Sequence, residues 1–200
     1  IGKEYHQHPK LTLERAEQTG WLMAAELRSV GVDFSFAPVL DLDYGVSQVI
    51  GDRAFHRDPL AVTDIARAYI QGMKRAWMSA VGKHFPGHGA VTSDTHTEIS
   101  KCNLKFHELS SHISTFKDLH EKYKIPIMTS HIVYNQISNN PVTTSSKWLH
   151  DLSEKIERIS EDEKLRMAGF RKPESQHRFL AARGALRLIL AGLQKAGDPA

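Results

Sequence analysis

Residues 79–98, SAVGKHFPGHGAVTSDTHTE, decide the fold, because a short apolar run leads directly into a loop dense with ionisable side chains. Residues 79–81 are small or β-branched, as in a buried strand, and three glycines together with Pro86 exclude a helix after them. The segment carries these charged or proton-transferring residues: Lys83, His84, His88, Asp94 and His96. We therefore predict a strand that feeds a catalytic loop, with an ordinary polar surface loop as the alternative.

The segment before this stretch predicts a helix followed by a strand. Between residues 11 and 30, small and apolar residues recur every three or four positions, and Gly31 follows where a helix C′ residue belongs. Residues 32–39, VDFSFAPV, are typical of a short buried strand. A long polar loop at residues 41–59 comes next, and it is a second candidate for a functional segment.

The same order of helix, strand and polar loop then recurs. Residues 60–77 predict a helix with one apolar face, residues 104–123 are weakly helical, and residues 125–131, IPIMTSH, predict a third short strand. Repeated βα units with polar groups after the strand ends are typical of a (β/α)8 barrel or an open doubly wound sheet. Because no glycine-rich nucleotide-binding motif occurs, we favour an α/β fold of the (β/α)8 TIM-barrel type.

The chain changes character after residue 150. Residues 153–166 are rich in charge, residues 178–193 predict an amphipathic helix, and no further strand is predicted. A closed barrel needs eight strands and about 250 residues. We therefore predict a partial TIM-type barrel domain over residues 1–150, followed by a helical tail of different origin over residues 151–200.

Composition excludes several classes of protein. The net charge is +3, and the 10 Lys or Arg and 7 Asp or Glu of residues 153–200 make that tail basic while the rest is neutral. No nucleic acid partner is expected without clustered cations, and no membrane span is expected without a run of about 18 apolar residues. Cys102 is the only cysteine, which excludes an intrachain disulfide and agrees with a reducing compartment, so we expect a cytoplasmic location.

Four segments of the first 150 residues resemble the bacterial β-N-acetylhexosaminidases of glycoside hydrolase family 3, of the cell-wall recycling type. They are WLMAAELRSVGVDFSFAPVLDLDYG at 21–45, VIGDRAFHRDP at 49–59, GKHFPGHGAVTSDTH at 82–96 and IMTSH at 127–131. The resemblance implies a TIM-type barrel that removes terminal non-reducing β-linked N-acetylglucosamine from peptidoglycan fragments with retention of configuration. It implies a muropeptide or chitooligosaccharide as substrate, and neither a cofactor nor a metal.

The resemblance also implies roles for individual residues. Glycoside hydrolysis requires a general acid and then a general base, and most families use a pair of carboxylates. In this family a histidine serves, so His96 is the implied acid/base, and Asp94 orients its imidazole and favours its charged form. Arg53, Lys83 and His84 are implied to hydrogen-bond the sugar hydroxyls and the N-acetyl group.

Four other polar residues of these segments receive weaker interpretations. Asp41 is either a structural residue or a support for the sugar-binding residues. Asp52 and His56 are expected to brace their own loop. His88 receives no role.

Two departures from the family pattern affect the expected activity. An upstream strand with an acidic sugar-binding residue and a further arginine is expected before Ile1, and the nucleophilic aspartate is expected in a loop well after residue 131. Asp151 and Asp162 have the wrong surroundings for that nucleophile. Without it no glycosyl-enzyme intermediate forms, so we expect the 200-residue chain alone to be inactive or nearly so.

Three alternatives remain open at this point. Residues 159–193 weakly resemble the N-terminus of a Sfp-type 4′-phosphopantetheinyl transferase, although a generic amphipathic helix pair would look similar. A metal-dependent hydrolase would use His84, His88 and His96 as ligands, but Pro86 prevents the helix that a His-x-x-x-His zinc site requires. A non-catalytic sugar-binding remnant or a chimeric fragment would keep the sugar contacts without the nucleophile.

Overall fold

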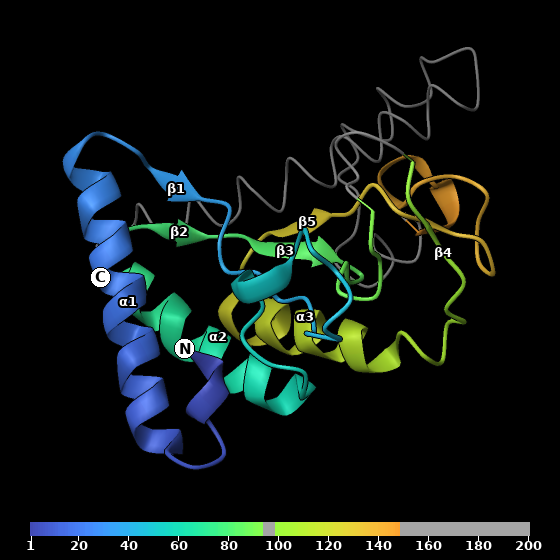
Figure 1. Ribbon diagram of the computed structural model, residues 1–200. Helices are drawn as coiled ribbons and strands as arrows, with labels where there is room; N and C mark the ends of the chain where they lie inside the picture. Colours follow the sequence, from blue (N-terminus) through green and yellow to red (C-terminus); the bar gives the residue numbers. More distant parts are fainter. Residues whose placement is uncertain (94–98, 149–200) are drawn as a thin grey trace, which may run out of the picture.

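The computed structural model describes residues 1–93 and 99–148 (Figure 1). The α-helices in this part of the chain are α1 (Pro9–Ser29), α2 (Pro59–Arg75) and α3 (Ser110–Tyr123). The strands are β1 (Phe34–Ser35), β2 (Ser79–Ala80), β3 (Gly82–Phe85), β4 (Lys101–Cys102), β5 (Ile127–Thr129) and β6 (Val133–Tyr134). Three 3₁₀ turns complete the described elements, at Gly2–Glu4, Gly51–Arg53 and Val142–Thr144.

Segments far apart in the sequence lie side by side as parallel strands. β1 pairs with β2, β3 pairs with β5, and a bridge between Val39 and Lys83 joins the end of the first segment to β3. Figure 1 shows α2 and α3 on one side of this row of strands. The chain thus has an α/β fold in which helices connect parallel neighbours, as the repeated helix and strand pattern predicts.

The strand predicted at residues 79–81 is longer in the structure. After β2 it continues as β3, so Lys83 and His84 lie on a strand and not in a loop, which corrects the expectation from the sequence. The Lys83 amide donates to the Pro38 carbonyl at 3.2 Å on one side. A glycine such as Gly82 weakens a strand but does not end it when both neighbouring segments supply hydrogen-bond partners.

The other strands also differ from the sequence prediction. Within the predicted strand at residues 32–39, β1 is only two residues long, and pairing resumes at Val39. Pro38 lies between them and has no N–H to donate to the ladder, which explains the interruption. The parallel pair of β4 with β6 was not predicted, because two-residue strands have no recognisable pattern of alternation.

Helices α1 and α2 pack closely because glycines lie where their backbones meet. A Cβ on Gly20 would lie 2.2 Å from the carbonyl oxygen of Tyr69, and one on Gly72 would lie 1.9 Å from that of Glu17. The face of α1 that is buried carries residues spaced four apart: Thr12, Ala16, Gly20 and Ala24. Small side chains at this spacing let the two helices approach at backbone distance.

Local signals at the helix ends agree with the observed bounds. Asp58 precedes α2, and its Oδ1 accepts the amide of Leu60 at 3.0 Å, which satisfies one of the free N–H groups of the first turn. α3 ends at Tyr123, and the next residue, Lys124, adopts a left-handed conformation with φ 55°. Val30, the last residue of the apolar pattern at residues 11–30, lies just after α1 and is 75% exposed.

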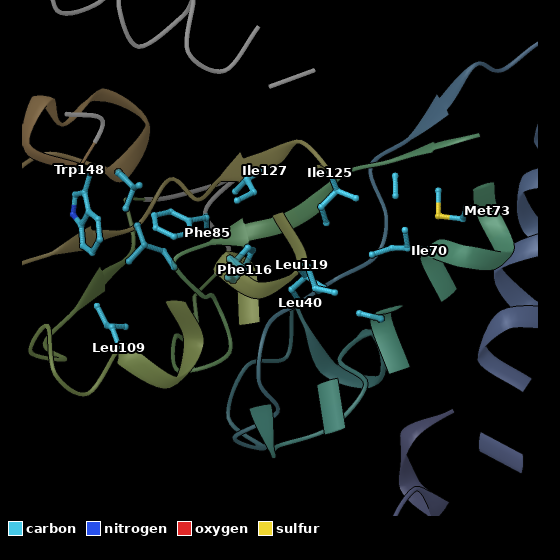
Figure 2. Packing of buried hydrophobic residues seen from close by; sticks show 14 of the residues in the cluster. Leu40, Ile70, Met73, Phe85, Leu109, Phe116, Leu119, Ile125, Ile127 and Trp148 are labelled. Carbon is cyan, nitrogen blue, oxygen red and sulfur yellow. The ribbon is translucent and has the colours of Figure 1, made fainter. Parts of the chain in front are cut away.

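One hydrophobic cluster connects the helices to the strand ends (Figure 2). The ring of Phe85, the last residue of β3, packs edge to face on Phe116 of α3 and on Trp148, with centroids 5.4 Å and 6.1 Å apart. Leu40 and Ile127 belong to the same cluster. This packing anchors the end of β3, where the next loop begins.

Two further findings concern the chain as a whole. None of the helices within residues 1–93 and 99–148 is long and apolar enough to cross a membrane. The helical tail predicted at residues 151–200, with the resemblance at residues 159–193 and with Asp151 and Asp162, lies outside the described residues. Those sequence predictions therefore stay predictions.

Candidate active site

A completely buried carboxylate, that of Asp41, lies at the centre of the candidate site. Its Oδ2 lies 2.7 Å from Nδ1 of His84, and its Oδ1 accepts the backbone amides of His84 at 3.3 Å and of His88 at 2.6 Å. A buried carboxylate without partners would be strongly destabilising, and these three contacts supply the partners. Asp41 thus holds both His84, one of the residues predicted to bind the sugar, and the backbone at His88.

His84 and Lys83 reach this region from β3. The side chain of His84 keeps 18% of its surface exposed although Nδ1 faces the buried carboxylate. Lys83 is half-buried, and burial lowers the pKa of its ammonium group, an effect that the charge of Arg53 increases and that of Asp41 opposes. Lys83 therefore lies within electrostatic reach of both the guanidinium and the carboxylate.

Arg53 is exposed and is held by its own loop. Its Nε donates to the carbonyl oxygen of Val49 at 3.2 Å, which fixes the guanidinium near the turn at Gly51–Arg53. Its charge also lowers the pKa of His88. The structure thus brings Arg53, Lys83 and His84, the three predicted sugar contacts, into one region around Asp41. The predicted catalytic residues Asp94 and His96 lie outside the described residues.

His88, which received no role from the sequence, is almost completely buried beside His84. The two rings meet edge to face with centroids 5.7 Å apart. Burial lowers the pKa of His88, and the nearby Asp41 carboxylate opposes that shift. The backbone amide of His88 makes the shortest of the described contacts to Asp41, so this residue connects the loop after β3 to the buried carboxylate.

Helix α3 and strand β6 support the loops around Asp41 through contacts that the sequence analysis missed. Nε2 of buried His112 lies 2.7 Å from the hydroxyl of Tyr44, and the hydroxyl of Tyr134 donates to the carbonyl of Gly87. Gly87 has φ 142°, and a Cβ there would lie 2.3 Å from Nδ1 of His112. No local sequence signal could reveal these contacts, because Tyr44 and His112 are 68 positions apart.

Asp52, in the 3₁₀ turn at Gly51–Arg53, and His56, shortly before α2, were expected to brace their own loop. His56 does so, since its carbonyl accepts the amide of Asp43 at 3.0 Å and its Nδ1 accepts the amide of Asp58 at 2.9 Å. Asp52 does not, because it is exposed and forms an ion pair with Lys3 of the N-terminal segment at 3.8 Å. An exposed pair of this kind contributes little to stability.

One group of side chains among the described residues has the composition of a metal site, with ligand atoms within 4.8 Å of one another: His6, His56 and Asp58. The Nδ1 lone pair of His56 already accepts the Asp58 amide. The neutral ring therefore carries its proton on Nε2 and has no lone pair left for a cation there. The donor chemistry of this group does not fit a metal ion.

The metal-dependent alternative from the sequence requires His84, His88 and His96 as ligands, and His96 lies outside the described residues. The described side chains Arg53 and Lys83 are cations, which repel a metal ion but can hydrogen-bond a small polyhydroxylated molecule.

Comparison with known proteins gives one matching family over most of the chain. Residues 7–155 match the Glycosyl hydrolase family 3 N terminal domain. The beta-hexosaminidase of Methylobacillus flagellatus is 48% identical over 150 residues, which are 74% of this chain and 43% of that protein. The beta-hexosaminidase of Methylococcus capsulatus is 51% identical over 141 residues, 70% of this chain and 42% of that protein. The chain thus spans less than half the length of these curated relatives.

A solved structure with a bound sugar derivative has a similar fold. NagZ from Neisseria gonorrhoeae in complex with N-trifluoroacetyl-D-glucosamine superposes with a TM-score of 0.74 and 31% sequence identity. The superposition covers 92% of this chain and 55% of that chain. The structure of native NagZ from the same organism gives a TM-score of 0.75 and 34% identity.

Proposed function

This chain belongs to glycosyl hydrolase family 3, and from that premise we propose that its site acts on terminal non-reducing β-linked N-acetylglucosamine, as a retaining β-N-acetylhexosaminidase. The names of the curated relatives support this class of reaction. The N-acylated glucosamine bound to the similar NagZ structure supports the class of sugar. A muropeptide or a chitooligosaccharide would supply such a terminal residue.

The observation that carries the proposal is the placement of Lys83 and His84 beside buried Asp41, with Arg53 within electrostatic reach. Cationic donors held by a rigid support suit sugar hydroxyls and an N-acetyl oxygen, which need hydrogen bonds of fixed direction. In this proposal Arg53, Lys83 and His84 bind the sugar. Asp94 and His96 perform the proton transfers, His96 first as acid to the leaving oxygen and then as base to water.

The proposal extends to the architecture and the surroundings of the protein. The parallel order of β1, β2, β3 and β5 supports a partial (β/α)8 barrel over residues 1–150, with residues 151–200 as a helical tail of separate origin. The single cysteine, Cys102, is buried and free, which supports a reducing compartment such as the cytoplasm.

Calorimetric titration of the chain with N-acetylglucosamine, compared with glucose, tests the proposed sugar class. We expect saturable binding of N-acetylglucosamine and at least tenfold weaker binding of glucose, because a missing N-acetyl group leaves one of the hydrogen-bonding groups of the site without its partner. Equal affinity for both sugars, or no binding by a chain with a folded circular dichroism spectrum, would contradict the proposal.

The same titration separates binding from catalysis. Because His96 is proposed to act on the leaving oxygen and on water, His96→Ala should leave the affinity for N-acetylglucosamine within about threefold of the original. A larger loss of affinity would instead place His96 among the sugar-binding residues.

A further inference from the structure

We infer that Asp41 is a positioning residue that holds the ring proton of His84 on Nδ1, so that Nε2 offers a lone pair to a sugar hydroxyl. The assignment of the ligand rests on the proposed function, whereas the assignment of the proton rests on the geometry alone. Asp41 makes no contact with the sugar in this account and acts through His84.

One oxygen of Asp41 contacts backbone amides, and the other contacts the side chain of His84. Oδ1 receives the amides of His84 and His88, and Oδ2 lies 2.7 Å from the ring nitrogen Nδ1 of His84, its one contact among the described residues. A carboxylate has no proton to donate, so Nδ1 of His84 is the donor in that contact. The neutral imidazole carries a single N–H, and its Nε2 is then an acceptor.

An acceptor at this position complements the neighbouring charges. Lys83 and Arg53 can only donate hydrogen bonds, whereas each sugar hydroxyl both donates and accepts. A site built from cations alone would leave the hydroxyl protons without partners. Nε2 of His84 supplies the missing acceptor, and the buried Asp41 carboxylate also places a negative charge within reach of the Lys83 ammonium.

The substitution Asp41→Asn tests the assignment because it keeps one oxygen of the side chain and replaces the other with an NH₂ group. The amide oxygen of asparagine can keep both backbone N–H contacts, while its NH₂ group replaces Oδ2 and donates to Nδ1 of His84. The ring proton must then move to Nε2, which changes from acceptor to donor. Asp43→Asn is the matched control, since Asp43 is exposed in the same loop and its Oδ1 accepts the Gly45 amide at 2.8 Å.

The readout is the ¹⁵N NMR spectrum of histidine-labelled chain at a pH above the ordinary imidazole range, where neutral rings dominate. The signals of His84 are identified from their loss in His84→Gln. We expect the proton on Nδ1 in the unsubstituted chain and in Asp43→Asn, and on Nε2 in Asp41→Asn. A proton on Nε2 in the unsubstituted chain overturns the inference even if Asp41→Asn fails to fold, and so does an unchanged position in folded Asp41→Asn.

Titration with N-acetylglucosamine distinguishes this inference from the proposed function. The loss of one acceptor should weaken sugar binding by Asp41→Asn about tenfold while Asp43→Asn binds normally. Equal binding by Asp41→Asn with a shifted proton overturns the role of Nε2 toward the sugar. If the proton moves as expected but the unsubstituted chain binds no N-acetylglucosamine, the proposed function fails and the positioning of His84 by Asp41 stands.

Discussion

Gly20 of α1 and Tyr69 of α2 approach so closely that a Cβ on Gly20 would lie 2.2 Å from the Tyr69 carbonyl oxygen. Because this oxygen belongs to the backbone, it cannot move aside by a rotation of a side chain. Alanine would gain about 1 kcal/mol in helix propensity, but the separation of the helices that it forces should cost more. We therefore expect Gly20→Ala to lower the free energy of unfolding by about 2 kcal/mol in urea denaturation.

Gln18→Ala is the control for this prediction, because Gln18 is exposed on the same helix. It should change the free energy of unfolding by less than about 0.5 kcal/mol. A Gly20→Ala chain as stable as the original would show that α1 and α2 can separate without loss.

The start of α2 depends on the side chain of Asp58. Asp58→Ala removes the acceptor of the Leu60 amide, so the free energy of unfolding should fall by about 1 kcal/mol. Asp58→Ser should recover most of that loss because serine also caps helices. Equal destabilisation by both substitutions would indicate that the carboxylate acts through its charge and not as a cap.

The contact between Tyr44 and His112 joins the candidate site to α3. Tyr44→Phe leaves Nε2 of buried His112 without its 2.7 Å partner, and we expect a loss of about 1–3 kcal/mol in the free energy of unfolding. Tyr123→Phe is the matched control, since no hydrogen bond of the Tyr123 hydroxyl to another described residue is found. If the two variants unfold at the same urea concentration, the Tyr44 hydroxyl contributes nothing measurable.

Three buried or half-buried histidines should make the protein sensitive to acid. Burial lowers the pKa of His56, His88 and His112 below the ordinary value of about 6.5. The unfolded chain therefore takes up protons first as the pH falls. Stability should be fully present above about pH 6.5 and should decrease below it, until the folded histidines are protonated as well.

Urea denaturation at pH 8.0 and pH 5.5 measures this dependence. His112→Gln should reduce the difference in stability between the two conditions, whereas His107→Gln, on the exposed surface, should leave it unchanged. A stability that does not fall between pH 8.0 and pH 5.5 would contradict the account of these buried rings.

The sequence was sufficient for the elements that leave a repeated local pattern. The three helices lie within a few residues of the predicted ranges, apart from the late start of α3 at Ser110, because their buried residues recur with the helical period. The polar segments that follow the predicted strands also lie near one another, since parallel strands end at a common edge. Contacts between distant positions could not be predicted, because nothing in the sequence near Tyr44 indicates that His112 is its partner.

The errors in the strands have a related cause. Whether a strand continues past Gly82 depends on the hydrogen bonds that its neighbours offer, and these come from Pro38 and Pro126, far away in the sequence. A local pattern identifies glycine as a residue that weakens a strand, but it does not show which hydrogen-bond partners the neighbouring segments supply. For the same reason the contacts of Asp41 with the amides of His84 and His88 could not be located from the sequence.

Calorimetric titration of Lys83→Ala with N-acetylglucosamine tests the central claim, that the residues around Asp41 form a sugar site. Lys74→Ala, at an exposed position on α2, is the matched control. We predict that the unsubstituted chain and Lys74→Ala bind the sugar equally, and that Lys83→Ala binds it at least tenfold more weakly, because a charged hydrogen bond is lost. Undiminished binding by Lys83→Ala, with its fold intact, would contradict the claim.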